Sequence, residues 1–484
     1  MLESSLARVD LSLFRFTSLV KWNYDRFVLG KRNIDRNSLV KQNSSRSTLV
    51  KRTFDKRFLA KRDSNKRRSR GNVITADGKK KAHARDAHLC YTEVMGYKTY
   101  TCTISKRCGG CELLAVPYEL QLKRKQHAMA ELFAEVIEQD GATLEPIRSM
   151  QKPLAYRYKA ASPYAPGKRM RCGFYERGTH RLVYCKQCLV EPHGIRRILN
   201  DIAHIADDLH IPAYHEDSGR GVLRHAVVRK GFATKDVLLT LVTNGKELPR
   251  REAFVSRIRK QHPEVTTIVQ NVNDRRTNAI LGTYNKTLFG PGIMHDKLLG
   301  CTFEIGPTSF YQTNPAQTEV LYQLALDGIE GCGSLLDAYC GTGTIGICAA
   351  SHARKNGTAL NVVGVEQVSG AVGCARRNAR ANDLADSCRF VCDDATGWMN
   401  SQAHHTFDAV ILDPPRAGST PQFLEGLARL HPTRIVYVSC NPTTQVRDLA
   451  TLRSAGYRAQ SIAPVDMFPH TKHVETVCLL THKG

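Results

Sequence analysis

A cysteine, Cys440, ends an apolar stretch that runs from Ile435 to Ser439, and it is followed by Asn441 and Pro442. The stretch predicts a buried strand. A core strand that needs only a small side chain at this point would normally have Ala or Val. A thiol at the open end of a strand is a candidate nucleophile in its thiolate form, although a lone cysteine is more often a small buried residue. The residues around Cys440 therefore decide between the two interpretations.

Acidic residues follow four other predicted strands in the last third of the chain. They are Asp337 in "SLLDA", Glu366 in "NVVGVE", the pair Asp393 and Asp394 after "RFVC", and Asp413 after "FDAVIL". Any one of these acids could be a turn or helix-capping residue. Ligands of open α/β sheets, however, bind at the carboxyl ends of the strands, where these acids and Cys440 would meet. We therefore expect one site, in which Glu366 accepts hydrogen bonds from ribose hydroxyls and Asp393 and Asp394 meet an adenine amino group.

Alternating strands and helices must position these residues. From Gly333 onward, apolar strands alternate with helical stretches, which predicts a parallel sheet with helices on both faces. Gly341 and Gly343 allow a tight turn before a helix that starts near Ile345, and such a turn brings backbone N–H groups close to a ligand. The last two apolar segments, 457–468 and 473–482, could form an antiparallel pair at the sheet edge, which makes seven strands. Because the turn lacks the third glycine of the dinucleotide fingerprint, the pattern favours an S-adenosylmethionine methyltransferase over an NAD enzyme.

A thiolate and a carboxylate at such a site suit the methylation of a pyrimidine ring. Carbon 5 of uracil is a poor nucleophile, but addition of the Cys440 sulfur to carbon 6 would convert the ring to an enolate whose carbon 5 accepts a methyl group. A base must then remove the carbon 5 proton, and Glu475 in "KHVETV" is the candidate, with His473 as the weaker one. Asp413 can accept a hydrogen bond from ring N3–H, and Gln312 in "PTSFYQTNP" can donate to or accept from the cofactor or the base. Asp413 followed by two prolines is also similar to the loop of enzymes that methylate exocyclic amines, which need no thiol.

Five motifs, "FYQTN", "DAYCGTGT", "ILDPPRAG", "VSCNP" and "HVETV" in this order, resemble those of the S-adenosylmethionine-dependent RNA uracil-C5 methyltransferase family. The resemblance runs from about Tyr91 to the C-terminus. It implies a seven-stranded Rossmann-like methyltransferase domain, with Cys440 as nucleophile and Glu475 as proton acceptor. It also implies contacts to the cofactor at Gln312, Tyr339, Thr344, Glu366, Asp394 and Asp413. Relatives vary between Thr and Asn at the position of Thr344.

Three cysteines near the start of this region have the spacing C-x5-C-x2-C, and they are Cys102, Cys108 and Cys111. Thiolates this close, with two glycines that let the chain wrap, suit a metal cluster. The fourth ligand would lie further on, at Cys172, Cys185 or Cys188, and spacing does not choose among them. A Zn²⁺ site with four cysteines is the alternative to an iron–sulfur cluster. The family resembled has its fourth cysteine in a segment like "KQCLV", which selects Cys188 and implies a [4Fe–4S] cluster.

The chain has 484 residues and a net charge of +25, which favours a polyanionic partner such as nucleic acid. Residues 1–90 carry 23 Lys and Arg against 8 Asp and Glu, with Leu and Lys recurring every ten residues from Leu19 and Lys21. This segment is too charged to build a core, so we predict a disordered basic arm that binds RNA phosphates. The alternatives are a low-complexity extension of little consequence and a natural start at Met95.

Residues 91–300 are predicted to form an iron–sulfur and RNA-binding central domain of mixed α/β structure, and residues 301–484 the methyltransferase domain. Basic and aromatic residues intermingle around the cysteines, which suits unpaired RNA, although for any one residue a solvated basic face is the alternative. The set comprises Lys106, Arg107, Lys123, Arg124, Lys125, Tyr156, Arg157, Tyr158, Lys159, Tyr164, Lys168, Arg169, Arg171, Phe174 and Tyr175. Arg224 and His225 in "VLRHAVVR" could also face RNA.

These observations predict an RNA methyltransferase that modifies carbon 5 of a uridine, in 23S ribosomal RNA because the cysteine cluster is typical of the ribosomal branch of the family resembled. The alternatives are a transfer-RNA uridine-5 methyltransferase, methylation of cytosine or an exocyclic amine, and an RNA-binding factor that has lost catalysis. No apolar run reaches the roughly 18 residues of a membrane span, and the N-terminus has no signal-peptide pattern. With 16 cysteines and no secretory signal, we expect a cytoplasmic monomer with no membrane partner and no obligate protein partner.

Overall fold

The computed structural model describes residues 91–94 and 97–482 of the chain, and all of these residues belong to one compact unit. The basic arm predicted for residues 1–90 lies outside the described residues. The described part begins with the hairpin β1 (Tyr91–Val94) and β2 (Tyr97–Tyr100) and the one-turn helix α1 (Ser105–Cys108), which carries part of the cysteine motif.

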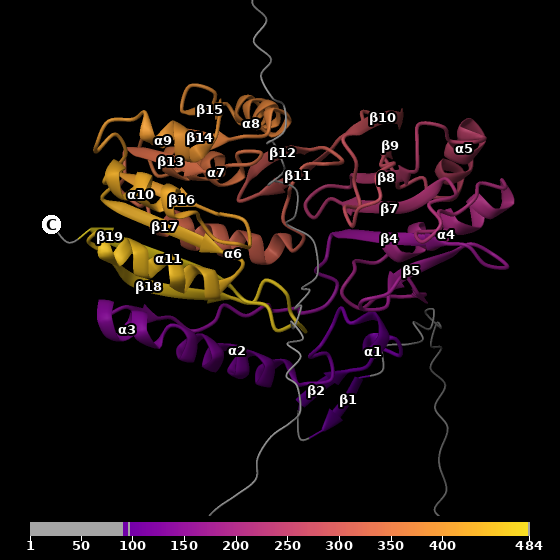
Figure 1. Cartoon of the computed structure of the whole chain (residues 1–484), viewed down its shortest axis with the longest axis horizontal. Helices are drawn as coiled ribbons and strands as arrows, with labels where there is room; N and C mark the ends of the chain where they lie inside the picture. Colours follow the sequence, from indigo (N-terminus) through magenta and orange to yellow (C-terminus); the bar gives the residue numbers. More distant parts are fainter. Residues whose placement is uncertain (1–90, 95–96, 483–484) are drawn as a thin grey trace, which may run out of the picture. The chain divides into compact units, whose positions relative to one another are not determined.

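An eight-stranded sheet organises the C-terminal part of the chain in the order β15-β14-β13-β16-β17-β19-β18-β3 (Figure 1). In chain order the strands are β3 (Thr143–Leu144), β13 (Ser334–Ala338), β14 (Asn361–Glu366), β15 (Cys388–Cys392), β16 (Ala409–Leu412), β17 (Arg434–Ser439), β18 (Tyr457–Val465) and β19 (Glu475–His482). Strands β13 to β17 are parallel to one another, and β19 runs antiparallel between β17 and β18. The predicted α/β fold is confirmed, and seven of the eight strands come from residues 334–482.

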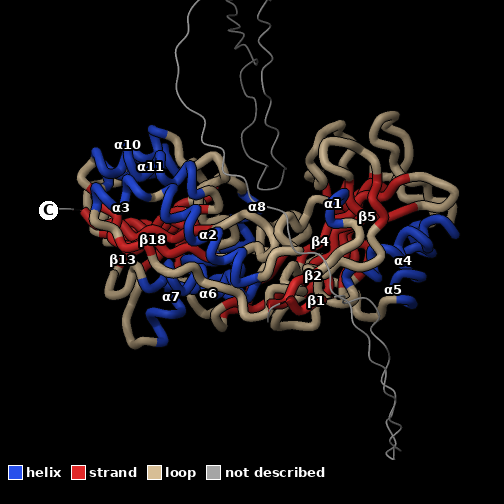
Figure 2. Tube along the Cα trace, turned by 90° about the horizontal axis from the view of Figure 1, so that it is seen from below, coloured by secondary structure: helices blue, strands red, loops and turns tan. Residues whose placement is uncertain are grey.

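Helices cover both faces of this sheet (Figure 2). One face packs against α6 (Pro315–Asp327), α7 (Thr344–Lys355) and α8 (Ser369–Ala381), and the other against α9 (Ala395–Asn400), α10 (Pro421–Leu430) and α11 (Pro442–Ser454). Successive residues of a strand point to opposite faces, so Leu335 belongs to the first core and Leu336 to the second. Burial on both faces explains the continuous apolar runs from which the strands were predicted.

An earlier segment of the chain completes the edge of this sheet. Val136 of helix α3 (Ala134–Asp140), and Phe133 between α3 and helix α2 (Tyr118–Leu132), are buried in the second core, and β3 pairs in parallel with β18. The N–H of Glu145 donates to the carbonyl of Ile462 at 2.9 Å. Residues 118–144, which the sequence analysis grouped with the central domain, therefore pack on the C-terminal sheet. The division into domains stays a prediction.

A second sheet, of seven strands in the order β10-β9-β8-β7-β4-β5-β6, forms the central part. Its strands are β4 (Lys159–Ala165), β5 (Arg171–Tyr175), β6 (Leu182–Tyr184), β7 (Leu223–Lys230), β8 (Val237–Thr243), β9 (Thr267–Val272) and β10 (Tyr284–Phe289). Helices α4 (Ile195–Asp208) and α5 (Arg251–Gln261) pack on it around a third core. The mixed α/β structure predicted for this region is confirmed.

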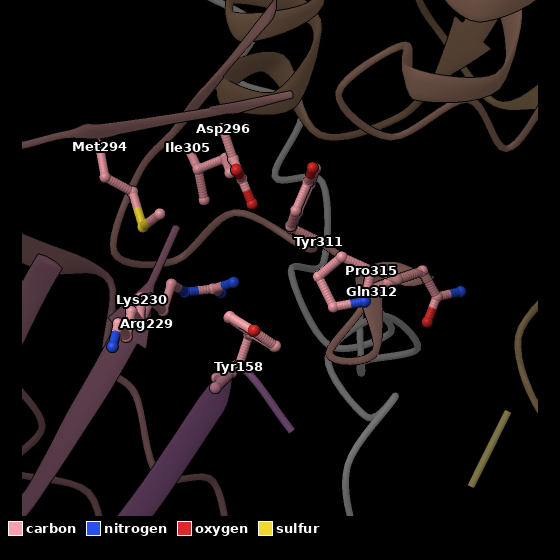
Figure 3. Close-up of a pocket in the computed structure, with 10 residues that line it drawn as sticks. Tyr158, Arg229, Lys230, Met294, Asp296, Ile305, Tyr311, Gln312 and Pro315 are labelled. Atoms are coloured by element: carbon pink, nitrogen blue, oxygen red, sulfur yellow. The ribbon is translucent and has the colours of Figure 1, made fainter. Parts of the chain in front are cut away.

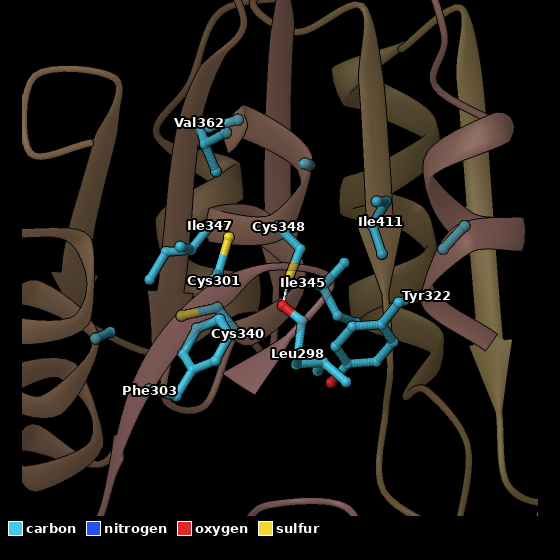
Figure 4. Packing of buried hydrophobic residues seen from close by; sticks show 14 of the residues in the cluster. Leu298, Cys301, Phe303, Tyr322, Cys340, Ile345, Ile347, Cys348, Val362 and Ile411 are labelled. Carbon is cyan, nitrogen blue, oxygen red and sulfur yellow. Dashed lines mark hydrogen bonds between the residues drawn. The ribbon is translucent and has the colours of Figure 1, made fainter. Parts of the chain in front are cut away.

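The hairpin of β11 (Met294–Leu298) and β12 (Cys301–Ile305) leads from the central part to the C-terminal sheet. Its apolar residues Leu298, Cys301 and Phe303 lie in the first core beside Tyr322 and Ile345 (Figure 4). This packing fixes the start of the loop 306–314, which holds Gln312. Among the residues that the structure describes, no helix is long and apolar enough to cross a membrane.

Candidate active site at the carboxyl ends of the C-terminal strands

The parallel strands bring their carboxyl ends to one edge of the C-terminal sheet. Ala338 of β13 pairs with Val365 of β14 and with Leu412 of β16. The next residue of each of these strands therefore reaches the same level, and these residues are Tyr339, Glu366 and Asp413. The structure thus gathers three of the residues that the sequence analysis assigned to the cofactor.

Strand register also brings Cys440 and Glu475 together. The last pair of the β17–β19 ladder is Ser439 with Thr476, so the next position places Cys440 opposite Glu475. Glu475 also pairs with Val465 of β18, and its side chain is buried, with 4% exposed. Cys440 is half-buried at the open end of β17. The predicted nucleophile and the predicted base, 35 positions apart in the sequence, therefore stand at one level of the sheet.

The residues after Cys440 tie three loops to one another. The side-chain amide of Asn441 donates to the carbonyl of Arg416 at 3.0 Å, and the Thr444 hydroxyl reaches the same carbonyl at 3.5 Å. The Arg416 guanidinium in turn lies 3.2 Å from Nδ1 of His473. Pro442 is the first residue of α11, where proline has no backbone N–H to lose. Asn-Pro therefore shapes the turn that leaves the thiol at a strand end, and Arg416, which the sequence analysis did not single out, joins the Asp413 loop to the Glu475 loop.

The glycine turn between β13 and α7 has one open and one closed side. Gly341 has φ +56°, and a Cβ placed there would meet no atom within 4 Å. A Cβ on Gly343, which has φ +76°, would lie 2.6 Å from the Phe390 ring. The Glu366 carboxylate holds the turn, since its two oxygens accept from the N–H groups of Gly341 at 3.2 Å and Val368 at 2.8 Å. Of these two glycines, Gly341 is therefore the one where a ligand could approach the backbone.

Asp337 is a buried carboxyl beneath this turn, with 1% of the residue exposed. It accepts a hydrogen bond from the N–H of Gly346 at 2.9 Å. Burial raises the pKa of Asp337 to about 7, and the charges of Asp413 and Glu366 raise it further against the effect of that N–H. Asp337 was predicted as one of the strand-end acids of the site, but its perturbed pKa depends on burial that sequence does not display.

Three other predicted cofactor residues already have partners in the protein. Tyr339, with φ +62°, packs its ring 4.9 Å from that of Phe423, measured between centroids. The Thr344 hydroxyl shares a hydrogen bond of 2.8 Å with the hydroxyl of Tyr322. Asp394 caps α9, where one carboxylate oxygen accepts from a backbone N–H of the first turn at 2.9 Å. These contacts stabilise the site, and an oxygen that accepts one hydrogen bond keeps capacity for another.

Gln312 lies beside a small pocket lined by Tyr158, Lys159, Arg229, Lys230, Met294, Asp296, Ile305, Tyr311, Gln312 and Pro315 (Figure 3). Figure 3 shows the Gln312 amide pointing away from Arg229. Burial lowers the pKa of Arg229 to about 10, and burial together with the charge of Arg229 lowers that of Lys159 well below its usual range. Asp296 accepts hydrogen bonds from the N–H groups of the 232–233 loop. The pocket therefore combines apolar side chains with basic groups whose positive charge burial disfavours.

The four predicted cluster cysteines, Cys102, Cys108, Cys111 and Cys188, are all half-buried. Burial raises the pKa of Cys108, and it raises the pKa of Cys111 to about 12. The charge of Cys102 raises the pKa of both thiols further. Burial raises the pKa of Cys188, and the charges of Glu191 and Cys185 raise it further. In residues 91–94 and 97–482, no group of three or more His, Cys, Asp or Glu is arranged to hold a metal ion. The donor chemistry suits an iron–sulfur cluster, but the thiols are not assembled around one, so no step of the reaction is derived through it.

Several residues predicted to face RNA are buried instead. Arg224 is 2% exposed and donates to the carbonyls of Asn273 and Arg275, and burial lowers the pKa of the adjacent His225 to about 3. Tyr156 and Tyr164 belong to the protein interior, and each donates its hydroxyl to a backbone carbonyl. The prediction that these residues contact RNA is wrong, since their polar groups are used inside the protein. Lys106, Arg107, Lys123, Arg124, Lys168, Arg169 and Arg171 are exposed.

Residues 300–483 match the family model described as tRNA (Uracil-5-)-methyltransferase. An uncharacterized RNA methyltransferase of Halalkalibacterium halodurans is 38% identical over 391 residues, which is 79% of this chain and 83% of that protein. An uncharacterized RNA methyltransferase of Staphylococcus aureus is 38% identical over 388 residues, with 79% and 84% covered.

A solved structure is also similar over most of the chain. It is the Pyrococcus abyssi tRNA (uracil-54, C5)-methyltransferase in complex with S-adenosyl-L-homocysteine. It superposes with a TM-score of 0.64 at 27% identity and covers 81% of this chain and 92% of its own. The similarity therefore includes the central part and is not confined to the C-terminal sheet.

Proposed function

Because the chain belongs to the RNA uracil-C5 methyltransferase family, we propose that it transfers a methyl group from S-adenosylmethionine to carbon 5 of a uridine in 23S ribosomal RNA, through a covalent Cys440–uracil adduct. The observation that carries the adduct is the register that sets Cys440 opposite Glu475. A thiol and a carboxylate at one level of a sheet can act on neighbouring atoms of one ring, as addition at carbon 6 and proton removal at carbon 5 require.

The Cys440 thiolate would bond to carbon 6 of a uracil that has left its stack, and the electron pair of the carbon 5–carbon 6 bond would move toward the carbonyl at carbon 4. S-adenosylmethionine supplies a methyl group on a positively charged sulfur. The enolate electron pair would bond carbon 5 to this methyl group, while the sulfur–methyl bond would break and leave its electron pair on the sulfur of S-adenosylhomocysteine. Glu475 would then remove the carbon 5 proton, the double bond would form again, and the sulfur–carbon 6 bond would break to restore the thiolate. Asp413 would accept the hydrogen bond of ring N3–H during these steps.

The residues around the glycine turn suit the cofactor. The open space before Gly341 would admit it, and the oxygens of Glu366 keep lone pairs for ribose hydroxyls although they already accept from two N–H groups. We assign the adenine amino group to Asp394 and further contacts to Gln312, Tyr339 and Thr344. Asp413 reaches the same edge as the thiol, so it would lie between the cofactor and the base.

We also propose a [4Fe–4S] cluster held by Cys102, Cys108, Cys111 and Cys188. The support is the C-x5-C-x2-C spacing, together with the effect of Cys102 on the pKa of Cys108 and of Cys102 and Cys108 on the pKa of Cys111. Protein purified without oxygen should contain about four irons per chain and show a broad visible absorption band. A zinc-loaded, colourless protein would rule the cluster out.

The cysteine motif supports ribosomal RNA as the substrate. Transfer RNA is the second candidate, because the matching family model and the Pyrococcus abyssi enzyme are both described by that substrate. Nucleoside mass spectrometry of ribosomal and transfer RNA from a deletion strain and its parent decides between them. Loss of 5-methyluridine from transfer RNA alone would reject the ribosomal assignment.

The covalent step is tested with RNA that contains 5-fluorouridine, because fluorine at carbon 5 cannot be removed as a proton and the adduct should persist. The wild-type protein should form a complex with this RNA that survives a denaturing gel, and Cys440→Ala should form none while still binding RNA. Cys332→Ala, which removes a half-buried thiol before β13, is the matched control and should behave as the wild type. An active Cys440→Ala protein would point to methylation of an exocyclic amine.

A further inference from the structure

The loop 466–474, between β18 and β19, ends at Glu475 and is held by a part of the chain more than 300 residues away. Asp466 follows Val465, the residue that pairs with Glu475, so both ends of the loop adjoin the position of the base. Residues 113–156 contact this loop at Asp466, Phe468, Pro469 and His470. Asn314 and Gln317 also donate to the carbonyls of Met467 and Asp466, and Arg416 reaches His473. The position of Glu475 therefore depends on a segment that belongs to neither strand of the hairpin.

A buried ion pair holds the first residue of the loop. Lys125 of α2 binds one oxygen of Asp466, and the Tyr118 hydroxyl donates to the other at 2.6 Å. Both charged side chains are almost fully buried, and the hydroxyl of Tyr118 also accepts from the N–H of Met150. Burial lowers the pKa of Lys125, and the charge of Asp466 opposes that effect. Removing either charge would leave the other uncompensated, so this pair fixes the loop but is a poor site for a test.

Gln121 connects the middle of the loop to the segment that follows the cysteine motif. Its side-chain oxygen accepts from the N–H of His470 at 3.0 Å, and its amide donates to the carbonyls of Leu113 at 3.0 Å and Val116 at 2.8 Å. The N–H of Leu113, two residues after Cys111, donates directly to the carbonyl of His470 at 2.9 Å. Gln121 is fully buried. One glutamine thus fastens the cysteine segment and the Glu475 loop to each other.

We propose that Gln121 is a positioning residue for the proton-transfer half of the reaction. Through Gln121, the segment after the cysteine motif, residues 113–116, would influence catalysis by fixing the position of Glu475. This inference rests on the proposed function, since it assigns proton removal to Glu475. The thiol needs no such support, because Cys440 follows the central strand β17. Glu475 opens the last strand, and a strand end is only as well placed as the loop that leads into it.

The test measures methyl transfer and removal of the carbon 5 proton separately in the same protein. Transfer of labelled methyl in a single turnover reports addition and methylation, and release of tritium from RNA labelled at carbon 5 of uridine reports proton removal. Gln121→Leu should transfer methyl at nearly the wild-type rate. It should release tritium about 10- to 100-fold more slowly, because a displaced catalytic group loses rate on this scale. The methylated adduct should then accumulate on ordinary RNA, as it should in Glu475→Gln.

Gln126→Leu is the matched control. Gln126 lies on the same helix and also bonds a loop, through the carbonyl of Glu145 at 3.1 Å and the N–H of Ile147 at 2.6 Å, without touching residues 466–474. This variant should release tritium as fast as it transfers methyl. Covalent trapping of 5-fluorouridine RNA counts the assembled sites in every preparation, so rates refer to folded protein only. Gln121→Asn, whose amide is one methylene too short, should show the same imbalance in milder form.

Three outcomes overturn the inference by different routes. Equal slowing of methyl transfer and tritium release in Gln121→Leu, or a rise only in the KM for RNA, would reduce Gln121 to a structural or RNA-binding residue. Failure of the wild-type protein to trap 5-fluorouridine RNA would remove the proposed function, and the inference with it. A wild-type protein that traps this RNA, while Gln121→Leu and Gln121→Asn both release tritium at the wild-type rate, would reject the inference alone.

Discussion

At the scale of single residues, several residues of the candidate site also make hydrogen bonds within the protein. Glu366 and Asp394 accept backbone hydrogen bonds, and Thr344 bonds Tyr322, so substituting them should change structure as well as the proposed cofactor contacts. Asp337 differs from these residues, because it is buried beneath the turn and near the charges of Asp413 and Glu366. Its ionisation therefore couples the stability of the fold to pH.

Asp337→Asn should make the protein less sensitive to pH. The pKa of Asp337 is raised from 3.8 to about 7, so the unfolded chain loses the proton first and this carboxyl costs stability as pH rises from about 4 to about 7. Relative to wild type, the variant should gain about 2 to 3 kcal/mol of unfolding free energy between about pH 5 and about pH 8, since one pKa unit is worth about 1.4 kcal/mol. Urea unfolding at both pH values measures this, with the exposed Asp386→Asn as control. A difference that does not change with pH would contradict it.

Residue types identified the candidate site, but burial decided what several residues do. Cys440, Glu475 and the strand-end acids could be chosen from sequence because their types and order are unusual for strand ends. Tyr156, Tyr164 and Arg224 could not be placed, since an aromatic or basic residue beside a strand can line a core or a surface with the same local pattern. The opposition of Cys440 and Glu475 was equally out of reach, because it depends on the register between β17 and β19.

At the scale of elements, the turn between β13 and α7 shows how two glycines of one motif do different work. Gly343 lies against Phe390 and allows helix and sheet to approach, whereas Gly341 faces open space. The sequence predicted a tight turn at both positions, and both glycines have positive φ in the structure. Which glycine serves packing and which leaves room for a ligand depends on Phe390, a residue of β15 that is distant in the sequence.

The two glycine substitutions should therefore fail in different ways. Gly343→Ala should lower the unfolding free energy by about 2 to 5 kcal/mol, because its Cβ would overlap the Phe390 ring in a strained backbone conformation. Gly341→Ala should cost only about 1 to 2 kcal/mol of stability. It should nevertheless weaken S-adenosylmethionine binding about tenfold or more, a loss of at least about 1.4 kcal/mol, because the added methyl enters the open space. Thermal unfolding and titration calorimetry measure both effects, and wild-type cofactor affinity in Gly341→Ala would contradict the assignment of that space.

At the scale of the whole molecule, charge and sequence predicted an RNA-binding enzyme with a C-terminal catalytic sheet, and the family assignment agrees. The packing of residues 118–144 on that sheet was not foreseen, because a two-residue strand such as β3 leaves no recognisable pattern. The basic arm, residues 1–90, lies outside the described structure, so its role is an expectation from composition alone. The dependence of RNA affinity on salt concentration tests this expectation.

Removal of residues 1–90 should weaken RNA binding and flatten its salt dependence. Each phosphate neutralised on a single strand contributes about 0.7 to the slope of log affinity against log salt, so an arm that contacts several phosphates should change the slope by several units. A full-length chain with Lys21, Lys31, Lys41, Lys51 and Lys61 changed to Gln should show part of the same change. An unaltered slope in the shortened chain would mean that the arm is a passive extension.

The pairing of β3 with β18 has a consequence for folding during synthesis on the ribosome. About 320 residues separate Thr143 from its neighbour Ser461, so a ribosome adding about 5 to 20 residues per second needs about 15 to 60 s to produce the partner strand. During this interval Phe133 and Val136 have no sheet to cover them. The apolar side chains of residues 118–140 stay exposed until the last strands have been synthesised, and exposed apolar surface promotes aggregation with other chains. We therefore expect a chaperone to bind the nascent chain as it leaves the ribosome.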